Sequence, residues 1–252
     1  MLAPRELDRL IVVLVSTRNP LNLGAAARAM SNFGFSHLRV VHPYEVAFRE
    51  ARSAVGAADV LAGAMQFDSL AESVEDCSLV VGTTAVSRRA VQHVLHPLEQ
   101  GGPLIAQRLR SEKVALLFGS EKTGLTNEEL SHCHWLMRVP TREKHSSMNL
   151  GQAVAVSLYE LVRNAAMARD SKVQPLAPSG TVHRITRVLI SVLSASGYLK
   201  SQASPSVQAK IRRQVLRLNL SSPDAELWLG MLRQIAWKVG ITEDQRDKKH
   251  RL

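Results

Sequence analysis

Apolar residues form short unbroken runs at intervals along the first two thirds of the chain. Leu10–Val15 and Val114–Phe118 are such runs, as expected for strands that are buried on both faces of a parallel sheet. Three shorter runs, Leu38–Val41, Leu79–Val81 and Trp135–Val139, end near glycine, proline or polar residues and predict further strands. Separated by helical stretches, these runs predict a mostly parallel sheet with helices on both faces.

Between the strands, apolar residues recur with helical spacing. Asn22 is a plausible N-cap for the first helix, and Gly34 is a natural place for that helix to end. The last helix of this part carries Leu150, Val154 and Leu158 one turn apart. We therefore expect helices over residues 22–33, 45–54, 69–75, 104–109 and 149–168.

The composition changes after residue 168. Residues 169–181, RDSKVQPLAPSGT, contain two prolines, a glycine and small polar residues, which is typical of a linker. Helical spacing then predicts three more helices, over residues 182–196, 206–218 and 223–239. The predicted organisation is an α/β domain at 1–168, a linker at 169–181 and a helical extension at 182–252.

Charge divides the chain at the same place. The formal net charge is +10, and residues 166–252 hold 15 Lys and Arg against 6 Asp and Glu, a net of +9. Residues 1–165 hold the other 17 against 16, a net of +1. A basic tail on a near-neutral body favours a polyanionic partner. Composition alone leaves nucleic acid, an anionic membrane and a merely solubilising surface open.

The chain has no run of 18 apolar residues, so we expect no transmembrane helix. Its N-terminus mixes acids and bases and has no long apolar stretch, so a secretory signal is not expected. Cys77 and Cys133 offer no disulfide framework, which favours the reducing cytoplasm. Cys77 precedes a buried strand, and we interpret it as an inert structural thiol.

Three segments at strand ends or helix starts carry candidate chemistry: Asn19–Met30, Phe118–Leu125 and His145–Gln152. Open α/β sheets bind ligands at the carboxyl ends of their strands. Each segment also has a plainer interpretation, namely a solvated arginine, a charged turn and a helix cap. The second segment has glycines but lacks Gly-x-Gly-x-x-Gly and the P-loop pattern, which argues against a nicotinamide-dependent enzyme.

Taken together, the order and spacing of these segments resemble the three motifs of SpoU-type members of the SPOUT methyltransferase superfamily. Gly82-Thr83-Thr84-Ala85 and the tail segment Trp228–Leu232 are similar to the TrmJ group of tRNA methyltransferases within it. The resemblance implies a trefoil-knotted α/β fold with a C-terminal helical extension. It also implies a homodimer and a bent S-adenosylmethionine held in the knot.

The resemblance further implies the site residues. Cofactor contacts are expected from Thr83, Thr84, Ala85, Gly119, Val139, Ser147, Met148 and Asn149. The implied catalytic cluster consists of Asn19, Arg28, Glu121, Ser147 and Asn149. Since a guanidinium is effectively always protonated, we interpret Arg28 as a stabilising cation and Glu121 as the better group to relay a proton. No metal is required.

The activity implied is 2′-O-methylation of a ribose in RNA, with cytidine or uridine 32 of the tRNA anticodon loop as the favoured target. Ribosomal RNA is an alternative substrate, and a catalytically idle RNA-binding protein is an alternative function. Expected partners are RNA and a second copy of the chain, without membrane or metal. His132-Cys133-His134 has metal-ligand residue types, but adjacent side chains point apart and no fourth ligand lies nearby in the sequence.

Overall fold

The protein is described by a computed structural model that covers residues 2–44, 57–85, 92–142, 144, 146–163, 174–199 and 203–241. Within these residues, all strands pair in parallel in one sheet of seven, in the order β3-β2-β1-β6-β4-β7-β5. The strands are β1 (Leu10–Val15), β2 (His37–Val41), β3 (Met65–Phe67), β4 (Leu79–Thr83), β5 (Leu95–Pro97), β6 (Val114–Phe118) and β7 (Trp135–Arg138). The predicted mostly parallel α/β sheet is confirmed.

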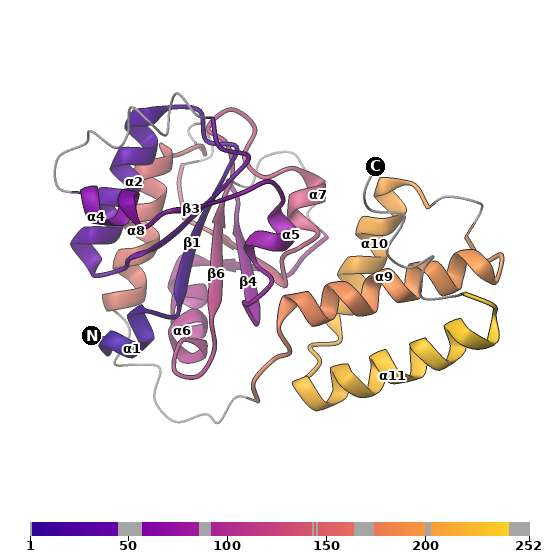
Figure 1. Ribbon diagram of the computed structural model, residues 1–252. Coiled ribbons are helices and arrows are strands. Elements are labelled where there is room, and N and C mark those ends of the chain that lie inside the picture. Colours follow the sequence, from indigo (N-terminus) through magenta and orange to yellow (C-terminus); the bar gives the residue numbers. More distant parts are fainter. Residues whose placement is uncertain are drawn as a thin grey trace.

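Helices cover both faces of this sheet (Figure 1). The helices of this part are α1 (Pro4–Leu7), α2 (Pro20–Phe33), α4 (Ala58–Ala62), α5 (Leu70–Ser73), α6 (Leu98–Arg108), α7 (Asn127–Leu130) and α8 (Leu150–Arg163). Along β1, Leu10, Val12 and Leu14 point into the core beneath α2, α6 and α8. The alternate residues Ile11, Val13 and Val15 join a second core with apolar residues of α5 and α7. Because both faces are buried, the strand is apolar throughout.

Helices α2 and α8 pack closely where they begin, at the carboxyl edge of the sheet. A Cβ atom added to Gly151 in α8 would lie 2.6 Å from the Cβ of Ala25 in α2. Only a residue without a side chain fits at this contact. The two helix starts, which carry the first and third candidate segments, are therefore held side by side.

Two predicted helix starts were wrong. Helix α2 begins at Pro20, and its N-cap is Asn19, whose Oδ1 accepts a hydrogen bond from the Leu21 N–H at 2.9 Å, so Asn22 is not the cap. Proline suits the first position of a helix, where its missing N–H costs nothing. Helix α6 begins at Leu98 and runs through Pro103. The helix predicted over residues 45–54 lies outside the described residues.

The chain ends in a unit of three helices, α9 (Ser179–Ala195), α10 (Pro205–Arg217) and α11 (Ser222–Lys238). They enclose a core of their own, which includes Ile185, Leu216 and Leu229. All three were predicted, although α9 starts within the stretch assigned to the linker. The reason is a tertiary contact, because the Ser179 N–H and hydroxyl both donate to the Cys77 carbonyl, at 2.8 and 2.7 Å. No helix in the described part of the chain is long and apolar enough to cross a membrane.

Candidate functional site

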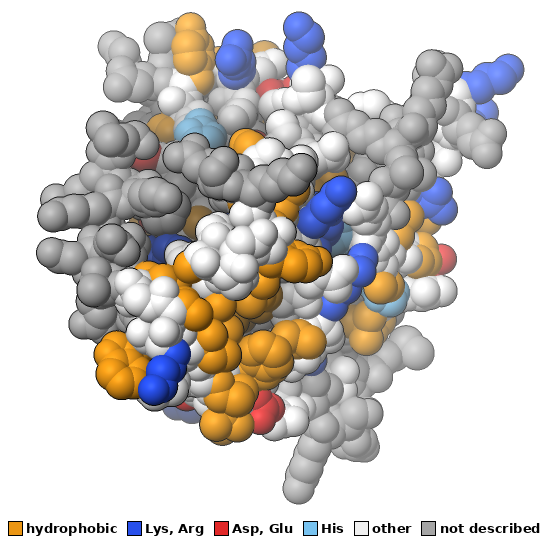
Figure 2. Space-filling view, turned by 90° about the vertical axis from the view of Figure 1, so that its right-hand side faces the viewer, with side chains coloured by type: hydrophobic (Ala, Val, Ile, Leu, Met, Phe, Trp, Pro, Cys, Tyr) orange, Lys and Arg blue, Asp and Glu red, His pale blue; other side chains and the backbone are white. Residues whose placement is uncertain are grey.

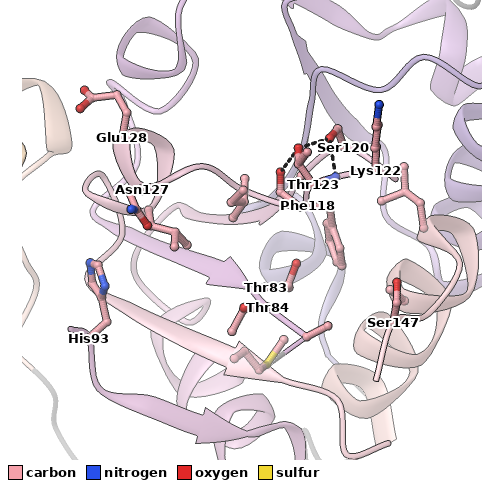
Figure 3. A pocket seen from close by; sticks show the side chains of 18 of the residues that line it. Thr83, Thr84, His93, Phe118, Ser120, Lys122, Thr123, Asn127, Glu128 and Ser147 are labelled. Carbon is pink, nitrogen blue, oxygen red and sulfur yellow. Dashed lines mark hydrogen bonds between the residues drawn. The ribbon is translucent and has the colours of Figure 1, made fainter. Parts of the chain in front are cut away.

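A cavity of about 800 Å³ opens at the carboxyl edge of the sheet. Its walls include Thr83–Ala85 at the end of β4, Phe118–Leu125 at the end of β6 and Ser146–Met148 before α8. Figure 3 shows Thr83 and Thr84 in the middle of the cavity, with Ser147 and Lys122 toward one end and His93, Asn127 and Glu128 toward the other. Segments far apart in the sequence thus meet where an open α/β sheet binds its ligands.

Most of the expected cofactor residues line this cavity. They are Thr83, Thr84, Ala85, Gly119, Val139, Ser147 and Met148. Asn149 does not line it, although its neighbours in the sequence, Met148 and Leu150, do; it directly precedes α8. The hydroxyl of Thr83 donates to the Leu117 carbonyl at 2.8 Å, which ties the segment after β4 to β6. The cofactor contacts themselves stay a prediction.

The turn after β6 is tight, and each of its two glycines is needed for a different reason. The Gly124 N–H donates to the Ser120 carbonyl at 2.8 Å, which closes the turn. A Cβ atom on Gly119 would lie 2.1 Å from the Gly124 carbonyl carbon, closer than any real contact. Gly124 has φ +65°, a left-handed conformation that suits glycine, although a Cβ there would meet nothing within 4 Å. Gly119 is therefore required for space and Gly124 for its backbone angle.

A chain of polar side chains connects this turn to the starts of α2 and α8. Asn22 Nδ2 donates to Glu121 Oε1 at 3.0 Å, and Asn149 Nδ2 donates to Asn22 Oδ1 at 2.7 Å. Asn22 is only 8% exposed, so its side-chain amide is largely shielded from water. The backbone N–H groups of Arg18 and Asn19 also point to the Glu121 carboxylate, at 3.5 and 3.4 Å. Glu121 is thereby fixed in position, and all three motifs meet at this point.

Asn22 is the residue that the sequence reasoning missed. Its place near a helix start suggested a capping role, whereas its side chain bridges Glu121 and Asn149. The signal available in the sequence was a polar residue between two leucines, Leu21 and Leu23. The structure shows that this position is buried. A buried amide needs partners, so its burial implies a polar neighbour from another segment.

The remaining predicted residues are placed less directly. The side chain of Asn19 caps α2, so only its backbone faces Glu121. Ser147 lines the cavity and is exposed. Arg28 lies six residues beyond Asn22 on α2, where it is exposed and does not line the cavity. The structure therefore brings Glu121 and Asn149 together through Asn22, and it does not place Arg28 in the cavity.

Helix α10 forms a further wall of the cavity, through Pro205, Ser206, Ala209, Lys210 and Arg213. It is held there by Arg212, whose Nη1 lies 2.7 Å from Glu128 Oε1 and 2.5 Å from Ser131 Oγ. A hydrogen bond from His132 and the Arg212 guanidinium lower the pKa of the Glu128 carboxyl to about 2. The basic tail was expected to meet a polyanion, but the Arg212 side chain in this tail is only 16% exposed and joins the two units.

The cavity has the properties of a nucleoside-sized site. Its volume falls in the range of small-molecule pockets. Leu125, Met137 and Val139 supply apolar walls, and the strand-end turns supply backbone polar groups. The Ser157 hydroxyl oxygen lines the cavity, is buried and has no hydrogen-bond partner among the described residues. A ligand that combines a flat apolar ring with hydroxyl and amino groups fits this donor set.

The His132-Cys133-His134 segment is built into the core. His134 Nδ1 accepts a hydrogen bond from the Val80 N–H at 3.1 Å, and His132 Nδ1 lies 3.2 Å from His183 Nε2 of α9. Cys133 is buried, and burial raises the pKa of its thiol. Burial likewise raises the pKa of the Cys77 thiol to about 12, as expected for an inert structural thiol. The described residues contain no group of three His, Cys, Asp or Glu side chains placed to hold a metal ion.

These buried histidines predict a loss of stability in mild acid. Burial lowers the pKa of His134 to about 4, and burial together with His132 and Arg212 lowers that of His183 to about 3. Below pH 6.5 these histidines therefore bind protons in the unfolded chain but not in the folded chain. We expect the free energy of unfolding to fall by roughly 1–2 kcal/mol per histidine between pH 6.5 and pH 5.

Urea unfolding at pH 7.5 and pH 5.0 measures this loss. His183→Gln should show a smaller loss than the unmodified chain, because glutamine keeps a polar group and does not titrate. His37→Gln replaces an exposed histidine and is the matched control. Equal losses in all three proteins would contradict the assignment.

Comparison with known proteins gives consistent matches. Residues 9–159 match the sequence profile of the SpoU rRNA Methylase family. The tRNA (cytidine/uridine-2′-O-)-methyltransferase TrmJ of Sodalis glossinidius is 35% identical, with 91% of this chain and 92% of that protein covered. The enzyme of the same name from Klebsiella pneumoniae is 37% identical, over 91% of this chain and 97% of that protein. The crystal structure of TrmJ from Z. mobilis ZM4 superposes with a TM-score of 0.76 at 29% identity, covering 89% of this chain and 98% of that one.

Proposed function

The chain belongs to the SpoU rRNA methylase family, and on this basis we propose that it methylates the ribose 2′-oxygen of a cytidine or uridine in tRNA, using S-adenosylmethionine. The observation that carries the proposal is the hydrogen-bonded chain from Glu121 through the buried Asn22 to Asn149, set beside a nucleoside-sized cavity. Similarity to enzymes named for cytidine and uridine in tRNA supports the substrate class.

We assign the cofactor to the cavity. Thr83–Ala85, Gly119, Val139 and Met148 would hold it, and Ser157 offers a polar atom that lacks a partner in the described structure. When bound, S-adenosylmethionine supplies a methyl group on a positively charged sulfonium. The protein's main task is then to hold the ribose hydroxyl in line with that methyl group, and such alignment is worth roughly 7–11 kcal/mol of barrier.

The polar chain supplies the remaining chemistry. As the 2′-oxygen attacks, its proton needs an acceptor, and the Glu121 carboxylate is the candidate. Hydrogen bonds from Asn22 and from two backbone N–H groups orient that carboxylate. Asn149 fixes Asn22 in turn. Arg28 stays protonated, so we assign it to the developing negative charge on the oxygen and to a nearby phosphate.

The finer parts of the proposal follow the family. We propose a trefoil knot in the segments around the cavity, a homodimer in the cytoplasm, and nucleotide 32 of the anticodon loop as the target. The close contact between the starts of α2 and α8 supports a chain that returns tightly on itself after β7. Ribosomal RNA remains the second candidate substrate, because the matched profile is named for it.

We expect the full-length protein to bind S-adenosylmethionine in the absence of RNA and added metal. All the described residues that line the cavity come from one chain, and the described residues hold no metal-binding cluster. Titration calorimetry measures this binding. The full chain is needed, since α10 forms part of the wall. A folded protein that binds neither the cofactor nor its demethylated product would contradict the methyltransferase assignment.

Labelled cofactor then identifies the substrate. Incubation with total RNA, followed by mapping of the labelled nucleotide, should place the label on the 2′-oxygen of a tRNA pyrimidine. Label on ribosomal RNA alone would favour the second candidate. Cofactor binding with no transfer to any RNA would favour a catalytically idle RNA-binding protein.

A further inference from the structure

One end of the cavity collects positive charge. Here Lys210 and Arg213 of α10 line the cavity together with Gln92 and His93, which precede β5. Figure 3 shows His93 at the end of the cavity opposite Ser147 and Lys122. Figure 2, which faces the C-terminal helices, shows more Lys and Arg than Asp and Glu side chains on that side of the molecule. This end of the cavity is thus distinct from the end that carries the catalytic cluster.

At this end of the cavity, Arg213 is hydrogen-bonded to a neutral side chain. Arg213 Nη2 donates to Gln92 Oε1 at 2.7 Å, and Arg217 Nη2 donates to the Gln92 carbonyl at 2.5 Å. Neither Arg213 nor Lys210 forms an ion pair with an acidic side chain in the described part of the chain. Glu128 also lines the cavity, but Arg212 already takes its Oε1 at 2.7 Å. Burial and the neighbouring Arg217 lower the pKa of Arg213, while Glu128 acts in the opposite direction.

His93 provides an independent sign of a missing ligand. Its Nε2 is buried and has no hydrogen-bond partner among the described residues. Buried polar atoms are normally paired, and an unpaired one beside a cavity calls for a ligand atom or a water. Burial, with Arg213 and Arg217 nearby, lowers the pKa of His93 to about 4. The cationic side chains of Lys210 and Arg213 are therefore the groups that attract an anion here, and the neutral His93 ring offers its unpaired nitrogen to a neutral hydrogen-bonding group of the same ligand.

We infer that Lys210 and Arg213 bind a phosphodiester of the substrate RNA beside the methyl-transfer site. The inference rests on the proposed function and adds a substrate-positioning role for α10 within the same chain. The other anion available is the cofactor's carboxylate, which is only a few bonds from its sulfonium. The sulfonium would have to lie near the turn that carries Glu121, between Ser120 and Lys122 and away from His93, so a phosphate is the better match (Figure 3).

Replacing Lys210 tests the inference, because that residue is exposed and belongs to neither the catalytic cluster nor the cofactor contacts. Lys210→Ala should raise the KM for tRNA about three- to tenfold and leave kcat at saturating tRNA near its original value. The slope of log affinity against log salt should flatten by about 0.7–0.9, as one phosphate contact is lost. Arg233→Ala removes an exposed cation from α11 and is the matched control.

Direct tRNA binding and calorimetry with S-adenosylmethionine complete the experiment. The inference is supported if Lys210→Ala weakens tRNA binding and Arg233→Ala does not. It is overturned if the two variants behave alike, or if Lys210→Ala weakens cofactor binding and leaves tRNA binding unchanged. Failure of the proposed function is a separate result. If the unmodified protein transfers no methyl group, its tRNA affinity can still be compared with that of Lys210→Ala, and this comparison shows whether Lys210 holds a phosphate.

Discussion

Gly119→Ala is expected to reduce the affinity for S-adenosylmethionine roughly 10- to 100-fold. The added methyl group would lie 2.1 Å from the Gly124 carbonyl carbon and 2.2 Å from the Leu125 nitrogen. Both are backbone atoms, so the clash is relieved only by moving the turn that forms the cavity wall. Overpacking of this kind costs about 1–3 kcal/mol, which sets the expected range. Calorimetry measures the affinity, and circular dichroism checks that the fold is kept.

Gly124→Ala is the matched control within the same turn. A methyl group there meets nothing within 4 Å, and the cost comes only from the positive φ of +65°. That cost is about 1–2 kcal/mol and is paid with or without ligand. We therefore expect a clearly smaller change in cofactor affinity than for Gly119→Ala. Equal affinities in the two variants would show that the turn does not shape the cofactor site.

Arg28→Ala is expected to reduce turnover about 100-fold or more, while the affinity for S-adenosylmethionine stays nearly unchanged. The loss of one preorganised charge that acts on a developing oxyanion typically has this effect on turnover. Affinity should survive, because Arg28 lies outside the cavity. Single-turnover methylation and calorimetry separate the two quantities. Collapsed affinity with surviving turnover would show that Arg28 is a cofactor contact instead.

Arg28→Lys refines the assignment. Lysine keeps the positive charge and loses the planar fork that pairs with phosphate or carboxylate through two bonds. An intermediate turnover would indicate that charge supplies part of the effect and geometry the rest. Turnover as low as that of the alanine variant would indicate that the fork itself is required.

The central strands were predictable because their burial leaves a direct trace in the sequence. Leu10–Val15 and Val114–Phe118 have the bounds expected from their apolar runs, since both faces of these strands are covered. The edge strands β3 and β5 are three residues each and partly exposed, so no such trace exists. The predicted helix at α6 was too short, because the sequence Gly101-Gly102-Pro103 is typical of a helix end. In the structure the two glycines let the helix approach Met137 and Glu160 closely.

The candidate site could be predicted only for residues that belong to one of the three family motifs and have a known role there. Glu121 and Asn149 follow from the resemblance, and the structure joins them. Asn22 could not be assigned in this way, because its partners lie 99 and 127 positions away in the sequence. The contribution of α10 was hidden for the same reason. A separate basic tail was expected, yet Lys210 and Arg213 line the cavity of the first domain.

The contacts that hold α10 against the α/β domain limit which C-terminal extensions from other family members could replace it. Arg212 reaches Glu128 and Ser131, and Arg213 and Arg217 converge on Gln92, so the extension recognises side chains and backbone of the body. At the opposite end of β4, Ser179 is anchored to Cys77. An extension grafted from another family member would have to match both anchorages to rebuild the wall of the cavity. A chimera of two distant relatives should therefore form this wall of the cavity poorly.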